Sequence, residues 1–157
     1  MTLAETLKSL LLNKIFLATV FSLIFAQVFK LVFYLITNKN KKKWDAVETI
    51  LWRTGGMPSS HSAVVCALAT ATGIYEGIAS TYFILSLIFA LVVLRDSVGV
   101  RRAAGLQAKA LNNLGKQLSK VTGQEFNSVK EIQGHTTLEV LVGSCLGILI
   151  AVIFHFI

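Results

Sequence analysis

The sequence predicts an all-α integral membrane protein, a helical bundle of about four transmembrane helices accompanied by amphipathic helices. Hydrophobic residues make up 54% of the 157 residues, the mean hydropathy is +0.68, and the apolar residues are gathered into long runs. Soluble domains are usually far less apolar. The length itself fits one membrane-embedded domain that covers residues 1–157.

The apolar runs locate the predicted spans. The first is a run of 22 residues interrupted only by Gln27 and Lys30, and about 20 apolar residues are enough to cross a bilayer core of about 30 Å. The second run is shorter and predicts either a full or a partial crossing. In chain order, the four runs are residues 15–36, 58–75, 78–94 and 138–157.

Two other segments have the pattern of amphipathic helices. Residues 1–14 carry leucines on one side and predict an interfacial helix before the first span. A cleaved signal peptide is the alternative, but the apolar run that follows is longer than a signal sequence requires and no small-x-small cleavage site follows it. Residues 106–121 predict a second amphipathic helix. A lysine-rich connector at residues 38–45 is expected to be a solvated loop or an anchor to lipid headgroups.

The charge and the cysteines exclude several classes of function. The net charge of +7 does not indicate a nucleic-acid partner, because the basic residues follow the loops of a membrane protein and no nucleic-acid-binding motif accompanies them. Cys66 and Cys145 lie in apolar runs, which is typical of buried thiols. Their number and spacing predict neither a disulfide framework nor a zinc site, so we expect no metal and no other cofactor.

Residues 53–62, Arg-Thr-Gly-Gly-Met-Pro-Ser-Ser-His-Ser, are the first candidate for chemistry. Two glycines free the backbone, and Pro58 is expected in the first turn of a helix. Ser59 and Ser60 are expected to cap that turn, with His61 just inside it. A helix start offers N–H groups and a positive dipole end to an anion such as phosphate. The alternative is an ordinary capped helix with a surface histidine.

Charged residues near the ends of the spans are candidate phosphate ligands. Lys30 either extends its ammonium to the membrane surface or points into the bundle as an anion ligand. After the third span, Asp96 either pairs with Arg95 or Arg102 at the membrane edge or lies beside arginines that bind the substrate. In the second case Arg101 or Arg102 holds phosphate through two parallel hydrogen bonds.

The last span begins with a histidine and an acid on one helical face. His135 and Glu139 are four residues apart. A carboxylate one turn away can accept the Nδ1–H and leave Nε2 as a base or nucleophile. The alternative is a helix cap with a chance His–Glu pair. Further along, Gly143 and Gly147 form a small-xxx-small pair that lets a helix approach closely, either within the bundle or from a second copy, so a homodimer is one expectation.

The predicted topology brings the candidate stretches together. If all four runs cross, residues 53–61, 95–102 and 130–139 lie on one side of the membrane. Only Lys8 and Lys14 lie on the other side. The positive-inside rule therefore predicts a multi-pass protein of the cell membrane with its site at the cytoplasmic face. The basic residues on the site side are Lys39, Lys41, Lys42, Lys43, Arg53, Arg95, Arg101, Arg102, Lys109, Lys116, Lys120 and Lys130.

Three motifs occur in order: G-G-M-P-S-S-H-S at 55–62, D-S-V-G-V-R-R-A-A-G-L-Q-A at 96–108 and G-H-T-T-L-E-V at 134–140. Together they resemble the small divergent branch, found among bacterial and plant membrane proteins, of the type 2 phosphatidic acid phosphatase and vanadium haloperoxidase superfamily. The likeness extends from about Gln27 to Gly147. It implies a membrane-embedded helical-bundle phosphatase that acts on lipid phosphates without a metal.

The resemblance also implies roles for individual residues. His135 is expected to attack phosphorus, and Glu139, where the superfamily more often has aspartate, is expected to hold that histidine. His61 is expected to protonate the leaving alcohol. Ser59 and Ser60, with serine where glycine is usual, are expected to contact the phosphate.

This sequence departs from the first motif of the superfamily. That motif places a lysine and then an Arg-Pro pair shortly before the second motif, whereas Arg53 here precedes a threonine. The matching lysine is Lys30 or Lys43. The usual site also faces outward, in contrast to the side that the charges predict here.

This sequence also departs from the third motif of the superfamily. That motif has an arginine six residues before the nucleophile, but position 129 of this sequence is valine and Lys130 follows it. Arg101 and Arg102, from the preceding helix, are the candidates to replace that arginine as phosphate ligands, with Asp96 beside them.

The sequence therefore predicts an enzyme that hydrolyses a lipid phosphate or an isoprenoid diphosphate through a phospho-histidine. One histidine must be neutral to attack and the other protonated to donate, which predicts a bell-shaped pH profile. Two alternatives stay open. One is a non-enzymatic scaffold or transporter subunit that binds anionic lipid or phosphate, and the other is an enzyme that transfers phosphate between lipids.

Overall fold

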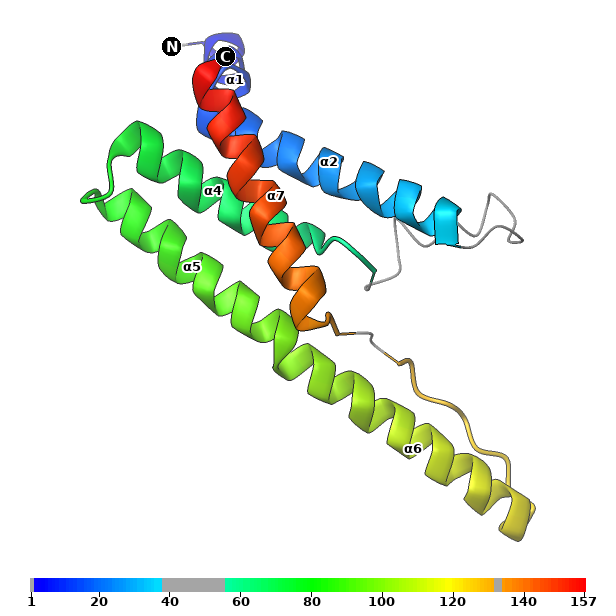
Figure 1. Cartoon of the computed structure of the whole chain (residues 1–157). Helices are drawn as coiled ribbons and strands as arrows, with labels where there is room; N and C mark the ends of the chain where they lie inside the picture. The colour runs from blue at the N-terminus through cyan, green and yellow to red at the C-terminus, as the bar shows by residue number, and fades with distance from the viewer. Residues whose placement is uncertain (1, 38–55, 132–133) are drawn as a thin grey trace.

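The computed structural model describes residues 2–37, 56–131 and 134–157, and all regular secondary structure in these ranges is helical (Figure 1). The predicted all-α membrane bundle is confirmed. In chain order, the helices are α1 (Leu3–Leu11), α2 (Lys14–Thr37), α4 (Ser60–Glu76), α5 (Thr81–Val98), α6 (Val100–Thr122) and α7 (Thr137–Phe156).

Three helical stretches are long and apolar enough to cross a membrane: α2, the joined α5 and α6, and α7. The fourth predicted span corresponds to α4, whose 17 residues extend about 26 Å at 1.5 Å per residue. It is the least apolar of the four bundle helices. The sequence distinguished it correctly as the weakest span.

Helix α4 is nevertheless the centre of the bundle, because α2, α5 and α7 all pack on it. Its buried side chains are small or carry hydroxyl groups, so its neighbours approach closely. Gly143 and Gly147 of α7 lie against the backbone carbonyls of Ser59 and Ala63. The predicted small-xxx-small pair therefore packs within the chain, against α4. The buried residues of α4 are Ser60, Ser62, Ala63, Val65, Cys66, Ala67, Ala69, Ala71 and Thr72.

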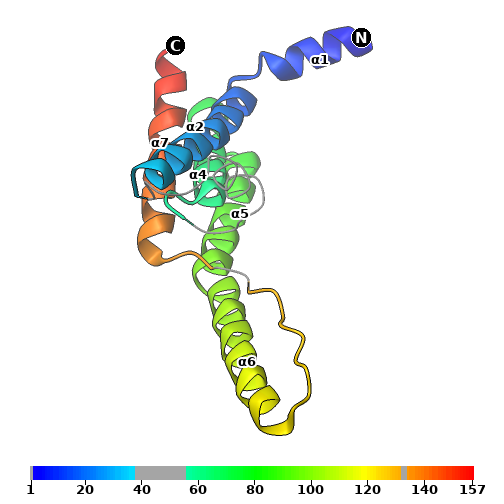
Figure 2. The ribbon, with the colours of Figure 1, turned by 90° about the vertical axis from the view of Figure 1, so that its right-hand side faces the viewer.

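Helix α1 is separate from the bundle, as the prediction of an interfacial lead requires (Figure 2). A capping box at Thr2 and Glu5 begins it. Its leucines, Leu3, Leu7 and Leu10, are exposed. This is the arrangement expected of a helix that lies with its apolar side in a lipid interface.

Helix α6 continues α5 out of the bundle (Figure 1). The N–H of Gly99 donates to the carbonyl of Arg95, and the Gly99 carbonyl accepts from the N–H of Ala103, each at 2.9 Å. These are the closing bond of α5 and the opening bond of α6, and Gly99 is the cap of both, so the two helices meet at a break in the helical backbone. The predicted amphipathic helix at 106–121 is confirmed, but it begins at Val100, directly after the third span.

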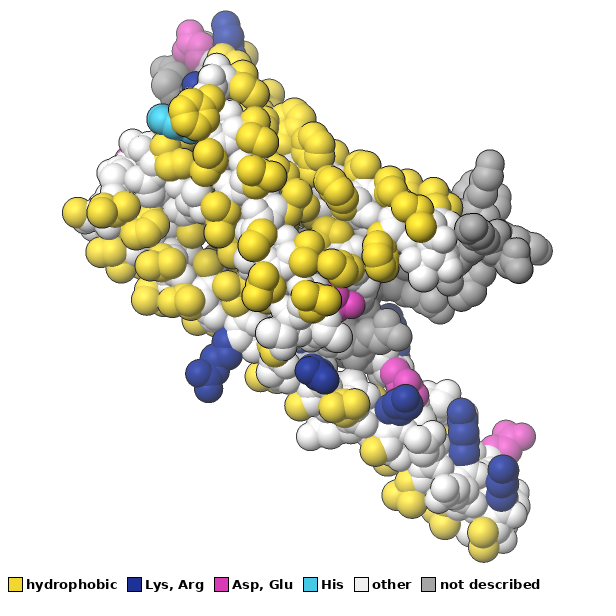
Figure 3. All heavy atoms as spheres, viewed as in Figure 1, with side chains coloured by type: hydrophobic (Ala, Val, Ile, Leu, Met, Phe, Trp, Pro, Cys, Tyr) yellow, Lys and Arg dark blue, Asp and Glu magenta, His cyan; other side chains and the backbone are white. Residues whose placement is uncertain are grey.

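The bundle and α6 differ in the side chains on their surfaces. Hydrophobic side chains cover the bundle, whereas lysines and arginines follow α6 (Figure 3). Residues 123–131 run back beside α6 toward α7 (Figure 2). Asn112 holds them through hydrogen bonds in both directions with the backbone of Val129, each at 2.9 Å.

Candidate active site

Segments that are far apart in the sequence meet at one end of the bundle. The N–H of Ser59, before α4, donates to the carbonyl of Glu139 in α7 at 3.0 Å. The N–H of His135 donates to the carbonyl of Ser97, at the end of α5, at 3.3 Å. Gly134 lies against the backbone of Arg102, where a Cβ would overlap it. The starts of α4 and α7 and the α5–α6 junction are therefore fixed to one another by their backbones.

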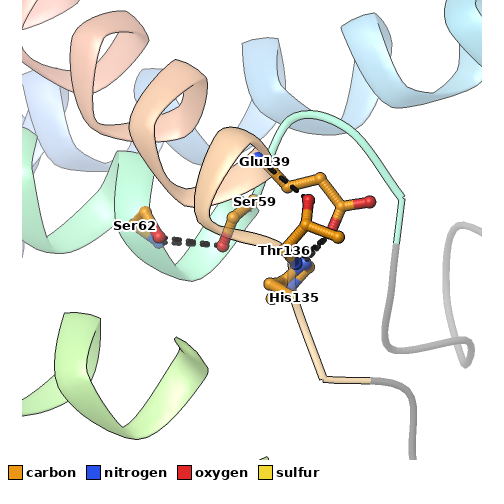
Figure 4. Close-up of polar contacts among 5 residues, drawn as sticks. All are labelled: Ser59, Ser62, His135, Thr136 and Glu139. Atoms are coloured by element: carbon orange, nitrogen blue, oxygen red, sulfur yellow. Dashed lines mark hydrogen bonds and ion pairs between the residues drawn. The ribbon is translucent and has the colours of Figure 1, made fainter. Parts of the chain in front are cut away.

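His135 and Glu139 form a direct pair at this end (Figure 4). The distance between His135 Nδ1 and Glu139 Oε2 is 3.1 Å, and the two side chains are 7% and 20% exposed. The same carboxylate oxygen accepts the N–H of Thr136 at 2.9 Å, while the Thr136 hydroxyl accepts the N–H of Glu139 at 3.3 Å. Glu139 is thus both the cap of α7 and the partner of the histidine, so the two interpretations of the sequence coexist.

This pairing selects one arrangement of the imidazole. A carboxylate beside Nδ1 accepts its proton, which leaves the lone pair of His135 on Nε2. A buried carboxylate also stabilises the positive charge that an imidazole gains when it forms a bond through Nε2. His135 therefore has the properties of an oriented nucleophile.

The start of α4 differs in one detail from the prediction. Ser59 is the N-cap and Ser60 the first helical residue, so Pro58 precedes the helix instead of lying in its first turn. The N–H of Ser59 donates to the backbone carbonyl of Glu139, which holds Ser59 at the cap. Proline has no N–H and could not make this bond. The Ser59 hydroxyl accepts from the N–H of Ser62 at 3.4 Å and from its hydroxyl at 2.9 Å (Figure 4).

His61 lies in the first turn of α4, outside the three membrane-spanning stretches, with its side chain exposed. Its pKa lies below the ordinary value, chiefly because the surrounding protein removes part of the ring's water. The positive charges of Arg101, His135 and Lys30 act in the same direction. The carboxylate of Asp96 opposes them. His61 therefore lies near enough to these four groups for their charges to act on it.

The candidate phosphate ligands are placed unequally. Lys30 is buried, and its side chain passes Gly56, where a Cβ would lie 3.1 Å from the lysine Cε. It therefore points into the bundle rather than toward the membrane surface. Arg101 and Arg102 lie in the first turn of α6 with exposed side chains.

Asp96 pairs with an arginine other than the two that the sequence suggested. Arg101 Nε lies 2.7 Å from Asp96 Oδ2, whereas Arg95 and Arg102 were the expected partners. The junction at Gly99 explains why Arg101 is the partner, because the non-helical backbone of Gly99 turns the Arg101 side chain toward the Asp96 carboxylate. The pair is partly exposed, at 43% and 37%, so it leaves Arg101 accessible to an anion.

One predicted ligand lies away from this cluster, and another lies outside the described residues. Lys130 is exposed and lies in the segment beside α6, directly after Val129, whose backbone is hydrogen bonded to Asn112. Asn112 is ten residues beyond Arg102, which is about 15 Å along a helix. Arg53, like Lys43, falls outside the residues that the structure describes.

Three contributions were not anticipated from the sequence. Ser97 supplies a carbonyl to the His135 N–H, and Ser62 supplies a second hydroxyl at the start of α4. Thr136 begins the capping box that holds Glu139. Only the last had a readable signal, the Thr-x-x-Glu pattern of a helix start. The Ser97 carbonyl depends on a contact between distant segments, whereas the Ser62 hydroxyl contacts Ser59 within the first turn of α4.

The model of a family described as "Divergent PAP2 family" matches residues 11–150. The match includes the described site residues, helices α2, α4 and α5, and α7 as far as Ile150. The chain belongs to the divergent PAP2 family.

A curated relative supports the same assignment. The "Uncharacterized membrane protein YuiD" of Bacillus subtilis (strain 168) is 37% identical to this divergent PAP2 protein over 158 residues, covering 94% of this chain and 97% of the relative. No solved structure matches the chain. The family and the membrane location therefore rest on sequence, and the site geometry of this member comes from its own fold.

Proposed function

We propose that this divergent PAP2 protein is a metal-independent membrane phosphatase that hydrolyses a lipid phosphate or an isoprenoid diphosphate. The observation that carries the proposal is the buried, carboxylate-oriented His135, close enough to His61 to act on the pKa of His61. Lys30, Arg101 and the α4 helix start supply positive potential there. Phosphoryl transfer needs little more than such positioning and electrostatic stabilisation.

The proposed reaction has two steps. His135 Nε2 attacks phosphorus and forms a P–N bond while the P–O bond to the lipid breaks, and His61 gives its proton to the departing oxygen. A water then attacks phosphorus, the P–N bond breaks, and His61 recovers a proton from that water. The products are the lipid alcohol, or monophosphate, and inorganic phosphate. Glu139 stabilises the positive phospho-imidazole between the two steps.

The location of the site fits a lipid substrate. The cluster lies at the end of apolar helices, so a phosphate can enter it while the attached chains stay among lipids. We propose the cytoplasmic side, because the described basic residues gather at this end and along α6, whereas Lys8 and Lys14 lie at the other end. Labelling of Lys109→Cys in intact cells tests the side, since an impermeant reagent reaches it only if the assignment is wrong.

The test of the activity is phosphate release by the purified full-length protein in lipid nanodiscs. Phosphatidic acid, phosphatidylglycerophosphate and a polyprenyl diphosphate are offered in turn, with and without EDTA. We expect release that EDTA does not change, that His135→Ala abolishes and that His61→Ala strongly reduces. His155→Ala is the matched control, because His155 lies on the same helix at its other, exposed end. Release that persists in both site variants would exclude these roles.

A second candidate is a non-enzymatic protein that binds anionic lipid or phosphate. It would use the same positive groups, Lys30, Arg101 and the start of α4, and would need no nucleophile. In that case phosphate binding survives His135→Ala and no phospho-histidine accumulates. A transfer of phosphate to another lipid is separated from hydrolysis by the acceptor, since radioactive phosphate then appears in lipid rather than in water.

A further inference from the structure

Helix α6 carries an apolar heptad seam that the chain itself does not cover. Residues at the two core positions of a heptad repeat follow one another through the whole helix. Leu111, Leu114 and Leu118 are 48%, 63% and 60% exposed, and Val121 is 86% exposed. We call this set the α6 seam. Its members are Val100, Ala104, Gln107, Leu111, Leu114, Leu118 and Val121.

The opposite side of α6 has the complementary pattern. Arg102, Lys109 and Lys116 repeat at seven-residue intervals, all at the outermost heptad position, and all are exposed. The positions beside the seam are small, with alanine at 103, 108 and 110. Small flanking residues let two helices approach, and charges remote from the contact stay in water.

The returning segment packs on one flank of the α6 seam. Phe126 lies against Gly115, and Asn112 binds the backbone of Val129. At about 100° per residue, Gly115 lies about 60° and Asn112 about 120° around the helix from Leu118. The leucines of the seam nevertheless stay 48–63% exposed. Within the described ranges, α5 is the only helix that contacts α6. The seam is therefore left open by the fold.

The direction of α6 argues against the membrane surface as the cover. The joined helix spans residues 81–122, which is 42 residues and about 63 Å. A bilayer core takes up only about 30 Å of it. Because α6 leads away from the bundle in the general direction of α5 (Figures 1 and 2), it projects from the membrane instead of lying flat. Gln107, in the middle of the seam, is also a poor residue to place in hydrocarbon.

A second copy of the chain can cover a seam that projects from the membrane and contains a glutamine. Copies inserted with the same topology carry parallel α6 helices at the same height above the membrane, and confinement to the bilayer raises their effective concentration. Two Gln107 amides can hydrogen bond across the two-fold axis, and a single polar core position of this kind fixes register. The seam lies on the part of the chain that extends out of the bundle (Figure 1). The partner therefore stands beside the bundle and not within it.

We propose that the protein is a homodimer held by a parallel, in-register two-stranded coiled coil of its α6 helices along the α6 seam. The surface is distinct from the Gly143/Gly147 pair, which is used inside the chain. It does not depend on phosphatase activity. The dimer begins at Val100, next to Arg101, so it would also hold the two sites at a fixed separation.

Cysteine crosslinking of the full-length protein in liposomes tests the proposal. Native Cys66 and Cys145 are replaced with alanine, and single cysteines are introduced as Leu114→Cys and Leu118→Cys. Mild oxidation should convert both to a species of about twice the 17.1 kDa chain. Lys116→Cys is the matched control, because it lies between them on the outer side, and it should remain monomeric. Equal crosslinking of Lys116→Cys, or none at either leucine position, would overturn the proposal.

A second measurement separates a dimer from burial in lipid. An environment-sensitive dye on Leu114→Cys should shift to shorter wavelength in the dimer and lose that shift when protein is diluted with excess lipid. A shift that is independent of dilution indicates immersion in the membrane and overturns the proposal. Replacing both Leu111 and Leu118 with Glu should abolish crosslinking at Leu114→Cys, and crosslinking that survives this change also overturns it.

Discussion

Replacement of Glu139 with glutamine separates the two tasks of this side chain. The amide keeps an oxygen for the Thr136 N–H, so α7 keeps its cap. It removes the negative charge that lies 3.1 Å from His135 Nδ1. The structure therefore predicts a protein that folds but stabilises the phospho-imidazole poorly.

The expected loss follows from that distance. At an effective dielectric of about 20, unit charges 3.1 Å apart attract by about 5 kcal/mol. The cost of desolvating the pair and the hydrogen bond that the amide retains offset about half of this. A remaining loss of about 2.7 kcal/mol corresponds to about a 100-fold decrease in kcat.

The assay compares two variants in nanodiscs. Phosphate release gives kcat, and thermal unfolding gives stability. Glu139→Gln should lose about 100-fold in kcat with little change in unfolding. Thr136→Ala is the counterpart, because it removes the other half of the capping box, with an expected cost of about 1 kcal/mol in stability, and leaves the carboxylate beside His135. A Glu139→Gln enzyme with wild-type kcat, or one that loses activity only in proportion to its unfolding, would refute the reasoning.

Three further predictions concern the rest of the site and its support. His61 must be protonated to donate and its pKa is lowered, so kcat/KM should fall as the pH rises through a value below about 6.5. Arg101→Ala should raise the pKa of His61 and move this fall in kcat/KM to higher pH. A pH profile that does not move would show that another group titrates. Gly147→Leu would force a side chain into the carbonyl of Ala63 and should lower stability by about 1–3 kcal/mol, measured as a lower Tm in detergent; an unchanged Tm would mean that the two backbones are not in contact. Lys30→Gln should raise KM about tenfold through the loss of a charged ligand with a smaller effect on kcat, and equal KM values would remove Lys30 from the site.

Local patterns in the sequence were sufficient for the helices and for the nucleophile pair. Apolar runs long enough to cross a bilayer predicted three spans directly, and the four-residue spacing predicted that His135 and Glu139 share a face. Both depend on helix geometry alone. The convergence of His61 with His135 followed from counting crossings, and the structure brings these histidines into one electrostatic cluster.

Contacts between distant segments were beyond such patterns. The partner of Asp96 depends on the turn that Gly99 introduces between α5 and α6, so closeness in the sequence suggested Arg95 or Arg102 instead of Arg101. The first turn of α4 was shifted because Ser59, not Pro58, has an N–H for the carbonyl of Glu139. The distance of Lys130 from the cluster is set by the hydrogen bonds of Asn112, which hydropathy does not encode.

The small, hydroxyl-rich surface of α4 has a consequence for how the chain enters a bilayer. This helix is made before α7, yet Gly143 and Gly147 of α7 are what later lie against it. Until then, the N–H of Ser59 lacks the carbonyl of Glu139 that later accepts it, and unpaired backbone groups are poorly tolerated in lipid. The stable placement of α4 must therefore await the synthesis of α7. A nascent chain stopped ahead of the final helix would expose an unfinished polar surface and be a natural target for membrane quality control.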